Sequence, residues 1–166
     1  LPDVVTGTIV TLAELPPAKA LLVMFICRHC PYVKHVMPEI GRIARDYADA
    51  GVSIVGISSN DAATYPEDAP ESLREMVASE GWSFPMLYDE SQDVARAYDA
   101  VCTPEFYVFD AERKLAYHGQ IDDSRHKNTL PLTGADLRAA LDAVLAGTPV
   151  PSPQKRAVGC SIKWKA

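Results

Sequence analysis

The chain has too few cysteines, too short an apolar run and too little positive charge for several classes of protein. Four cysteines among 166 residues are too sparse for a small fold held together by disulfides. The most apolar run, Ala20 to Cys27, is far shorter than the ~20 residues of a membrane-spanning helix, so no membrane insertion is expected. The net charge of −6 argues against nucleic acid or an anionic membrane surface as a partner, because both bind basic faces.

A recognisable signal peptide is also missing, which favours a cytoplasmic location. The chain begins at Leu1 rather than at a methionine, however, so the sequence leaves open a preceding segment and, with it, the compartment. An even number of cysteines fits two disulfides in an oxidising compartment as well as catalytic thiols in the cytosol.

Hydrophobic periodicity predicts strands that alternate with helices. The continuous apolar runs at 20–26 and 52–58 are typical of strands covered on both faces, and helical spacing connects them from residue 31 to about 50. This order predicts an α/β domain with a central mixed β-sheet flanked by helices. The other expected elements are a helix near 71–80, a strand at 84–88, a helix at 91–100, a hairpin of 106–109 and 114–121, and a helix from about 135 to 146.

Both ends of the chain are expected to add a strand to this domain. Thr8 to Leu12 alternates between apolar and polar residues, which predicts an N-terminal strand extension. We expect residues 1–147 to form the domain and residues 148–166 to be a tail that docks on it. After a proline-rich segment, the apolar residues of this tail take alternate positions, as in a half-buried strand: Val158, Cys160, Ile162 and Trp164.

Two cysteines separated by two residues lie where the first long apolar run meets a predicted helix, in the segment ICRHCPYV. A zinc knuckle would add His35 and a fourth ligand five residues later, but Ile40 occupies that position. Haem attachment needs a histidine directly after the second cysteine, where Pro31 stands instead. The sequence therefore predicts no metal and no other cofactor, and leaves a redox pair or two buried structural cysteines.

The position of the two cysteines favours redox chemistry. Cysteines three residues apart on a first helical turn can reach the Cα separation of ~5.5 Å that a disulfide tolerates. The positive end of the helix would stabilise a thiolate on Cys27, and Arg28 and His29 add a cation and a hydrogen-bond donor. We therefore predict an exposed Cys27 whose pKa lies below that of a free cysteine, in a couple more oxidising than about −270 mV.

Four segments, in the order ICRHCPYV, CTPEFYVFD, DDSR and GCSIKWK, resemble the thioredoxin-like superfamily and, more narrowly, its peroxiredoxin-related AhpC/TSA (redoxin) family. The resemblance implies a thioredoxin-like fold over nearly the whole chain. It also implies a thiol–disulfide oxidoreductase in which Cys27 attacks, Cys30 resolves the mixed disulfide, and a cis peptide bond joins Thr103 to Pro104 beside them.

Two other functions stay open. Peroxiredoxins carry Pro and Thr seven and three residues before the reactive cysteine, where this chain has Ala20 and Met24. A thiol-dependent peroxidase that forms a sulfenic acid on Cys27 is nevertheless the first alternative, and a binding module without catalysis is the second. The expected partners are protein or small-molecule disulfides and dithiols, peroxide in the first alternative, and a protein that reduces or oxidises the pair.

The remaining cysteines and polar residues have weaker assignments. Cys102 and Cys160 are either a second redox pair or two buried thiols without a partner. His118 is expected to be solvated on the polar face of its strand. No buried acid that could take the proton of Cys30 is identifiable, because the strand before the motif is wholly apolar.

Overall fold

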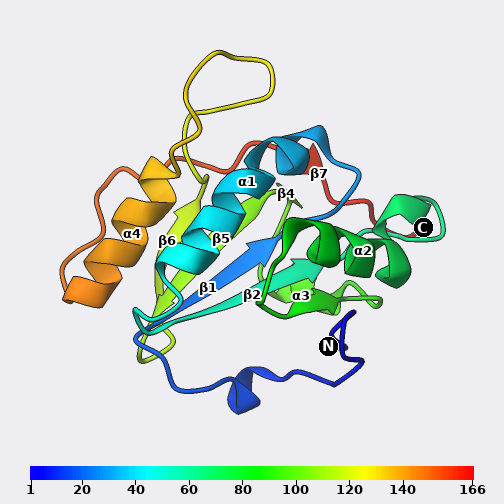
Figure 1. The fold of residues 1–166 in the computed structure, drawn as a ribbon, viewed down its shortest axis with the longest axis horizontal. Helices are drawn as coiled ribbons and strands as arrows, with labels where there is room; N and C mark the ends of the chain where they lie inside the picture. Colours follow the sequence, from blue (N-terminus) through cyan, green and yellow to red (C-terminus); the bar gives the residue numbers. More distant parts are fainter.

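A five-stranded mixed sheet forms the centre of the computed structural model, which describes all residues, 1–166 (Figure 1). The strand β1 lies in the middle, parallel to β2 and antiparallel to β5. This confirms the α/β architecture that the alternation of apolar runs predicts. Across the sheet the strands are β3 (Met86–Tyr88), β2 (Val52–Ser58), β1 (Ala20–Phe25), β5 (Glu105–Asp110) and β6 (Leu115–Gly119).

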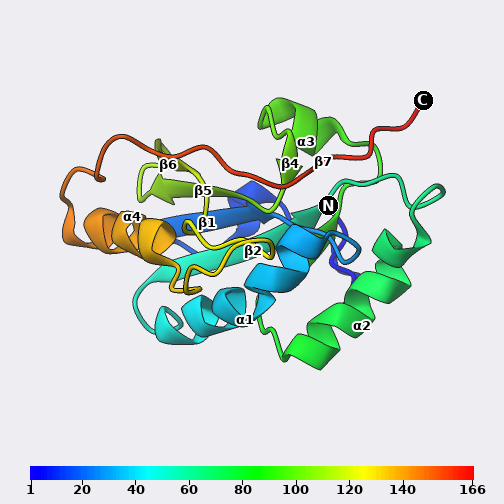
Figure 2. The ribbon, with the colours of Figure 1, turned by 90° about the horizontal axis from the view of Figure 1, so that it is seen from above.

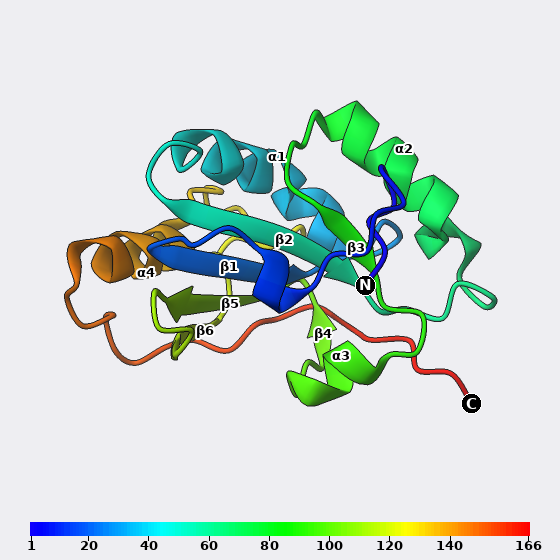
Figure 3. The same cartoon turned by 90° about the horizontal axis from the view of Figure 1, so that it is seen from below.

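Helices cover the two faces of the sheet unequally (Figures 2 and 3). One face carries the three long helices α1 (Pro31–Asp46), α2 (Pro70–Glu80) and α4 (Ala135–Ala146), and the other carries the short α3 (Asp93–Ala97) and the C-terminal tail. Both α2 and α4 end at a glycine in the left-handed conformation, Gly81 and Gly147, which closes a helix without strain. None of the helices has the length and apolar character needed to cross a bilayer.

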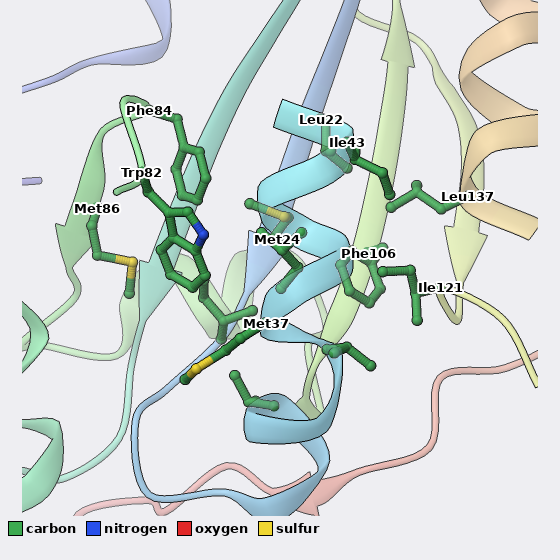
Figure 4. Close-up of a cluster of buried hydrophobic side chains, with 14 of the residues drawn as sticks. Leu22, Met24, Met37, Ile43, Trp82, Phe84, Met86, Phe106, Ile121 and Leu137 are labelled. Atoms are coloured by element: carbon green, nitrogen blue, oxygen red, sulfur yellow. The ribbon is translucent and has the colours of Figure 1, made fainter. Parts of the chain in front are cut away.

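Two hydrophobic clusters hold the sheet between these layers. Alternate side chains of β1 enter opposite clusters, so Leu22 and Met24 pack under α1 and α4, whereas Val23 and Phe25 pack on the face of α3. Figure 4 shows the larger cluster, in which Leu137 of α4 meets side chains of β1 and α1. Burial of each large apolar side chain stabilises the fold by about 1.5–3 kcal/mol, so the central strand holds the residues that follow it firmly in place.

The prediction of an N-terminal strand at residues 8–12 is wrong. Residues 1–10 form only isolated bridges, Pro2 with Ile9 and Asp3 with Leu87, and residues 12–14 form a 3₁₀ turn. A tight turn causes this, because the Asp3 carboxylate accepts hydrogen bonds from the Val5 N–H and the Thr6 hydroxyl. The arm therefore folds back on itself instead of extending the sheet.

The C-terminal tail pairs with a short strand at the end of the sheet. Strand β7 (Cys160–Ser161) runs antiparallel to β4 (Cys102–Thr103), and the Ile162 N–H donates to the carbonyl of Val101. Ile162 is buried, as the alternating pattern predicts, whereas Val158 and Trp164 remain largely exposed. In Figure 2 the tail runs along the side of the sheet opposite α1, from α4 past β4.

Candidate active site

The two motif cysteines occupy different positions relative to helix α1. The helix begins at Pro31, whose fixed φ and missing N–H suit the first helical position, and Cys30 is its N-cap residue. Cys27 precedes the helix and follows the end of β1 by two residues. The expectation that both cysteines share the first helical turn is therefore wrong, and Cys30, not Cys27, lies at the positive end of the helix.

Both sulfur-bearing side chains are fully buried. Cys27 and Cys30 each have 0% of their surface exposed and belong to the larger hydrophobic cluster. The expected exposure of Cys27 is therefore wrong, because this residue continues the buried course of β1 rather than standing at an open helix tip. Exchange with an external thiol or disulfide requires a movement that uncovers one of these sulfurs.

Thr103 contacts both sulfurs. Its hydroxyl lies 3.2 Å from Cys27 Sγ, and its carbonyl oxygen lies 3.4 Å from Cys30 Sγ. The following peptide bond, Thr103–Pro104, is cis, as the family resemblance implies. The fold thus brings the cysteine motif and the Thr-Pro segment together.

The reduced pair shares a single proton. The hydrogen bond between the two sulfurs is the largest effect on each: it lowers the pKa of Cys30 to about 4 and raises that of Cys27. Burial opposes the first shift and adds to the second. The side chain and backbone of Cys160 and the backbone of Val33 further lower the pKa of Cys30. The raised pKa of Cys27 runs against the expectation of a thiolate on this residue.

A buried carboxylate that sequence reasoning missed lies beside Cys27. Asp68, fully buried, accepts hydrogen bonds from the backbone N–H groups of Arg28 (2.7 Å) and His29 (3.1 Å) on one oxygen. Its other oxygen meets His29 Nδ1 and the amide of Asn60 (2.9 Å). The charge of Asp68 contributes to the raised pKa of Cys27. Asp68 ends a 3₁₀ turn (Pro66–Asp68) about forty residues from the motif, so sequence spacing gives no sign of it.

Arg28 and His29 are held by contacts with α2 and with the turn at Asp68. The Arg28 guanidinium bonds the carbonyl of Ser72 and the carboxylate of Glu75, which fixes the motif to α2 and neutralises the cation. His29 pairs with Asp68 and stacks on Tyr65. Both residues therefore hold the loop between the cysteines in place.

Three of these atoms are close enough to bind one metal ion. Ligand atoms of Cys27, His29 and Asp68 all lie within 4.8 Å of one another. Each Asp68 oxygen, however, already accepts two hydrogen bonds, and these donors satisfy the carboxylate without an ion. The donor set fits a positioning carboxylate better than a metal ligand.

Cys102 and Cys160 point to opposite faces of the small ladder that they share. Cys160 pairs directly with Thr103, and Cys102 pairs with Ser161, so the two cysteine side chains leave the ladder on different sides. Cys160 packs against the cluster that holds Cys30 and Cys27. Burial raises the pKa of Cys102 to about 12, with the Glu105 carboxylate adding to it, so this thiol is neutral at physiological pH.

His118 is exposed, as expected for the polar face of its strand, but it also contacts a buried carboxylate. Its Nε2 lies 2.6 Å from a carboxylate oxygen of the buried Glu105, and its ring stacks on Tyr107. Glu105 also accepts hydrogen bonds from the N–H groups of Val101 and Cys102. These contacts fix the backbone that leads into Thr103 and the site.

The loop after β6 also approaches the site. His35 Nε2 lies 2.8 Å from the hydroxyl of Ser124, which is buried. Asp122 secures the base of this loop by accepting hydrogen bonds from the N–H groups of Thr133 and Gly134. A small hollow beside Pro104 is lined by the loop and α1, through Tyr32, His35, Ser124 and Arg125.

Comparison with known proteins places this arrangement among thioredoxin-like structures. The AhpC/TSA family profile matches residues 1–118. The chain is 55% identical to an uncharacterized conserved protein of Geobacillus kaustophilus (99% of this chain and 87% of the other covered; TM-score 0.97). It is 49% identical to a hypothetical protein of Sinorhizobium meliloti (100% and 90% covered; TM-score 0.97).

More distant structures share the fold alone. A thiol:disulfide interchange protein of Chlorobium tepidum is 19% identical, with 87% of this chain and 90% of the other covered and a TM-score of 0.66. No curated protein sequence matches this chain. The thioredoxin-like fold expected from the four sequence segments is confirmed.

Proposed function

The chain belongs to the AhpC/TSA family, and within it we propose a thiol–disulfide oxidoreductase whose redox centre is Cys27 and Cys30. The contact of both sulfurs with Thr103, directly before Pro104, carries this proposal. Both cysteines lie at the junction of β1 and α1, three positions apart in the chain. The name of the structurally similar Chlorobium tepidum protein, a thiol:disulfide interchange protein, supports the same class of reaction.

The reaction exchanges one disulfide for another. The Cys30 thiolate attacks one sulfur of a substrate disulfide, which forms a mixed disulfide and releases the other substrate sulfur as a thiolate. Cys27 then loses its proton and attacks Cys30 Sγ, which forms the Cys27–Cys30 disulfide and releases the second substrate thiolate. The substrate gains two electrons and the pair loses two. Run backwards, the same steps oxidise a substrate dithiol.

Asp68 and His29 are suited to take the proton of Cys27. Thiols that attack a mixed disulfide must first be deprotonated, and Cys27 is a neutral thiol in the reduced pair. Besides Cys30, the imidazole of His29 and the carboxylate of Asp68 lie close to Cys27, with ligand atoms within 4.8 Å of the sulfur. Both are held in place by the hydrogen bonds described above, so they act as a fixed proton acceptor.

A peroxidase has less support from the local structure. The two positions that carry Pro and Thr in peroxiredoxins are Ala20 and Met24, which lie in β1 and are buried in the larger cluster. Met24 supplies no hydroxyl to orient a peroxide near Cys27. A thiol exchange reaction needs no such group, because the attacking and leaving atoms are both sulfur.

Insulin-disulfide reduction in the presence of a small dithiol tests the proposal. We expect the native chain to be active, Cys27→Ser and Cys30→Ser to lose turnover, and Cys102→Ser to keep it. Oxidation of a reduced peptide dithiol should follow the same pattern. Peroxide consumption without either exchange reaction would assign the pair to a peroxidase, and the absence of all three activities would assign the chain to a binding module.

A further inference from the structure

The chain's own tail covers the part of the site where an external strand would bind. Thr103 of β4 pairs with Cys160 of β7 and contacts both motif sulfurs with its side chain and carbonyl. The approach is so close that a Cβ on Gly159 would lie 1.9 Å from the Thr103 carbonyl oxygen. The backbone edge of β4 beside the cysteine pair is therefore occupied from within.

The pairing brings a third sulfur to the cysteine pair. Directly opposed residues of an antiparallel ladder project to the same face, so Cys160 shares the face of Thr103. Cys160 also packs against the cluster that contains Cys27 and Cys30. The side chain and backbone of Cys160 also lower the pKa of the Cys30 thiol. Cys102, on the other face of the ladder, has no comparable approach to the pair.

Further contacts keep the tail in this register. Beyond Cys160, the Lys163 carbonyl accepts hydrogen bonds from the Asp61 N–H (2.8 Å) and the Gln92 side chain (2.8 Å). The Lys163 N–H donates to the Asn60 side chain (2.8 Å), next to the loop that ends at Asp68. These bonds fix the backbone beside Cys160 at the site from its C-terminal side.

We propose that Cys160 is a third redox thiol of this site and exchanges directly with Cys30. This inference rests on the proposed function of the Cys27–Cys30 pair. Of the three residues, Cys160 alone keeps part of its surface exposed, whereas the other two are fully buried. Cys160 therefore carries oxidising or reducing equivalents between external thiols or disulfides and the enclosed pair.

The exchange step needs no outside oxidant. Starting from the Cys27–Cys30 disulfide, the Cys160 thiolate attacks Cys30 Sγ, so that the Cys30–Cys160 bond forms as the Cys27–Cys30 bond breaks. The electron pair of the broken bond leaves on Cys27, which takes up the proton that Cys160 gave up. The two disulfides are isomers with the same number of electrons. An external thiol then attacks Cys160 Sγ, forms a mixed disulfide there and releases the Cys30 thiolate.

Disulfide mapping after digestion with trypsin tests the proposal, because trypsin places the four cysteines on separate peptides. Cys27 is in ALLVMFICR, Cys30 in HCPYVK, Cys160 in AVGCSIK, and Cys102 in the peptide of residues 97–113. The full chain is equilibrated in glutathione buffers of different potential, quenched in acid and alkylated before digestion. We expect linked HCPYVK–AVGCSIK beside linked ALLVMFICR–HCPYVK, in a ratio that stays constant as the potential changes.

Variants make the outcome decisive. Cys27→Ser, treated with a disulfide-forming oxidant, should accumulate HCPYVK–AVGCSIK, and Cys160→Ser should lose that species. Cys160→Ser should also slow reduction of the oxidised chain by glutathione several-fold, whereas the matched variant Cys102→Ser should not. Linkage of AVGCSIK to the Cys102 peptide, or free Cys160 in all samples, would overturn the inference.

The outcome can be separated from that of the proposed function. If the native chain fails in insulin reduction and dithiol oxidation but the Cys30–Cys160 peptide forms, the function is wrong and the exchange is right. If exchange activity is present, and Cys160 stays free and its serine variant reacts at the native rate, the function stands and the third thiol is excluded.

Discussion

At the scale of single residues, the surroundings of the two motif sulfurs set their roles. Cys30 lies at the N-terminus of α1, and the neighbouring Cys27, Cys160 and Val33 lower its pKa to about 4. Cys27 lies beside the Asp68 carboxylate, and its pKa is raised. Because a thiolate attacks and a thiol does not, we propose that Cys30 is the residue that exchanges with substrate.

The order of attack is open to a trapping experiment. Removing the resolving sulfur leaves a mixed disulfide that cannot be released. We expect Cys27→Ser to trap substrate through Cys30, and Cys30→Ser to trap little, when each variant is incubated with a disulfide substrate and separated on a non-reducing gel. Trapping by Cys30→Ser alone would assign the attack to Cys27, as the family resemblance implies.

The shared proton predicts how the reduction potential changes with pH. Cys30 is ionised above about pH 4, and Cys27 keeps its proton beyond neutral pH, so reduction takes up one proton for two electrons. The potential should therefore fall by about 30 mV per pH unit between roughly pH 5 and 8. A fall of about 59 mV per unit, measured by thiol–disulfide equilibration, would show that both sulfurs are protonated.

The lowered pKa of Cys30 also predicts whether the standard reduction potential is high or low. At neutral pH the Cys27 thiol is protonated in any case, so its raised pKa does not change the reduction potential. The lowered pKa of Cys30 stabilises the reduced form and therefore raises the potential. We expect a standard potential above about −270 mV, from the same equilibration. A more negative value would mean that the thiolate is not stabilised in the folded chain.

Asp68 should matter for stability as well as for chemistry. Its carboxylate accepts four hydrogen bonds. In an asparagine, the NH₂ group would replace one accepting oxygen and would face N–H groups that also donate. Asp68→Asn should lower the free energy of unfolding by roughly 3 kcal/mol, because hydrogen bonds to charged groups are worth about 1.5–3 kcal/mol each. Urea denaturation measures this. Glu67→Gln, in the same 3₁₀ turn but exposed, is the control. Equal urea midpoints for Asp68→Asn and the native chain would contradict the account.

At the scale of elements, local patterns predict most of the strands and helices but not their partners. The apolar run of β2 and the glycine after α4 give bounds that match the structure, because both depend on neighbouring residues only. The N-terminal segment alternates like a strand, yet the turn at Asp3 leaves it without a partner. The helix expected at 91–100 is limited to α3, because Gln92 and Asp99 adopt positive φ.

The tail strand provides a prediction at this scale. A methyl group on residue 159 would collide with the backbone of Thr103, which cannot move aside as a flexible side chain can. Gly159→Ala should therefore loosen β7 from β4 and speed alkylation of Cys30 by iodoacetamide several-fold, measured by mass spectrometry of HCPYVK. Ser161→Ala, whose side chain is on an exposed residue of the same strand, is the control. Unchanged alkylation would mean that the tail does not limit access.

At the scale of the whole molecule, the fold encloses its reactive centre. The sheet buries the end of β1, α1 covers one side, and the tail and the turn at Asp68 meet over the cysteine motif. The sequence predicts the fold and the cysteine pair, because strand, motif and helix are contiguous. It does not predict the enclosure, which comes from Asp68 and Cys160, residues that only the tertiary structure brings to the motif.

The central claim is that Cys27 and Cys30 interconvert between dithiol and disulfide. An equilibrium redox titration of the full chain, mapped with trypsin, tests it most directly, because cleavage after Arg28 separates the two cysteines. We expect one two-electron transition in which alkylated ALLVMFICR and HCPYVK are replaced by their disulfide-linked pair, together with the HCPYVK–AVGCSIK isomer. Peptides that stay unlinked at every potential would contradict the account.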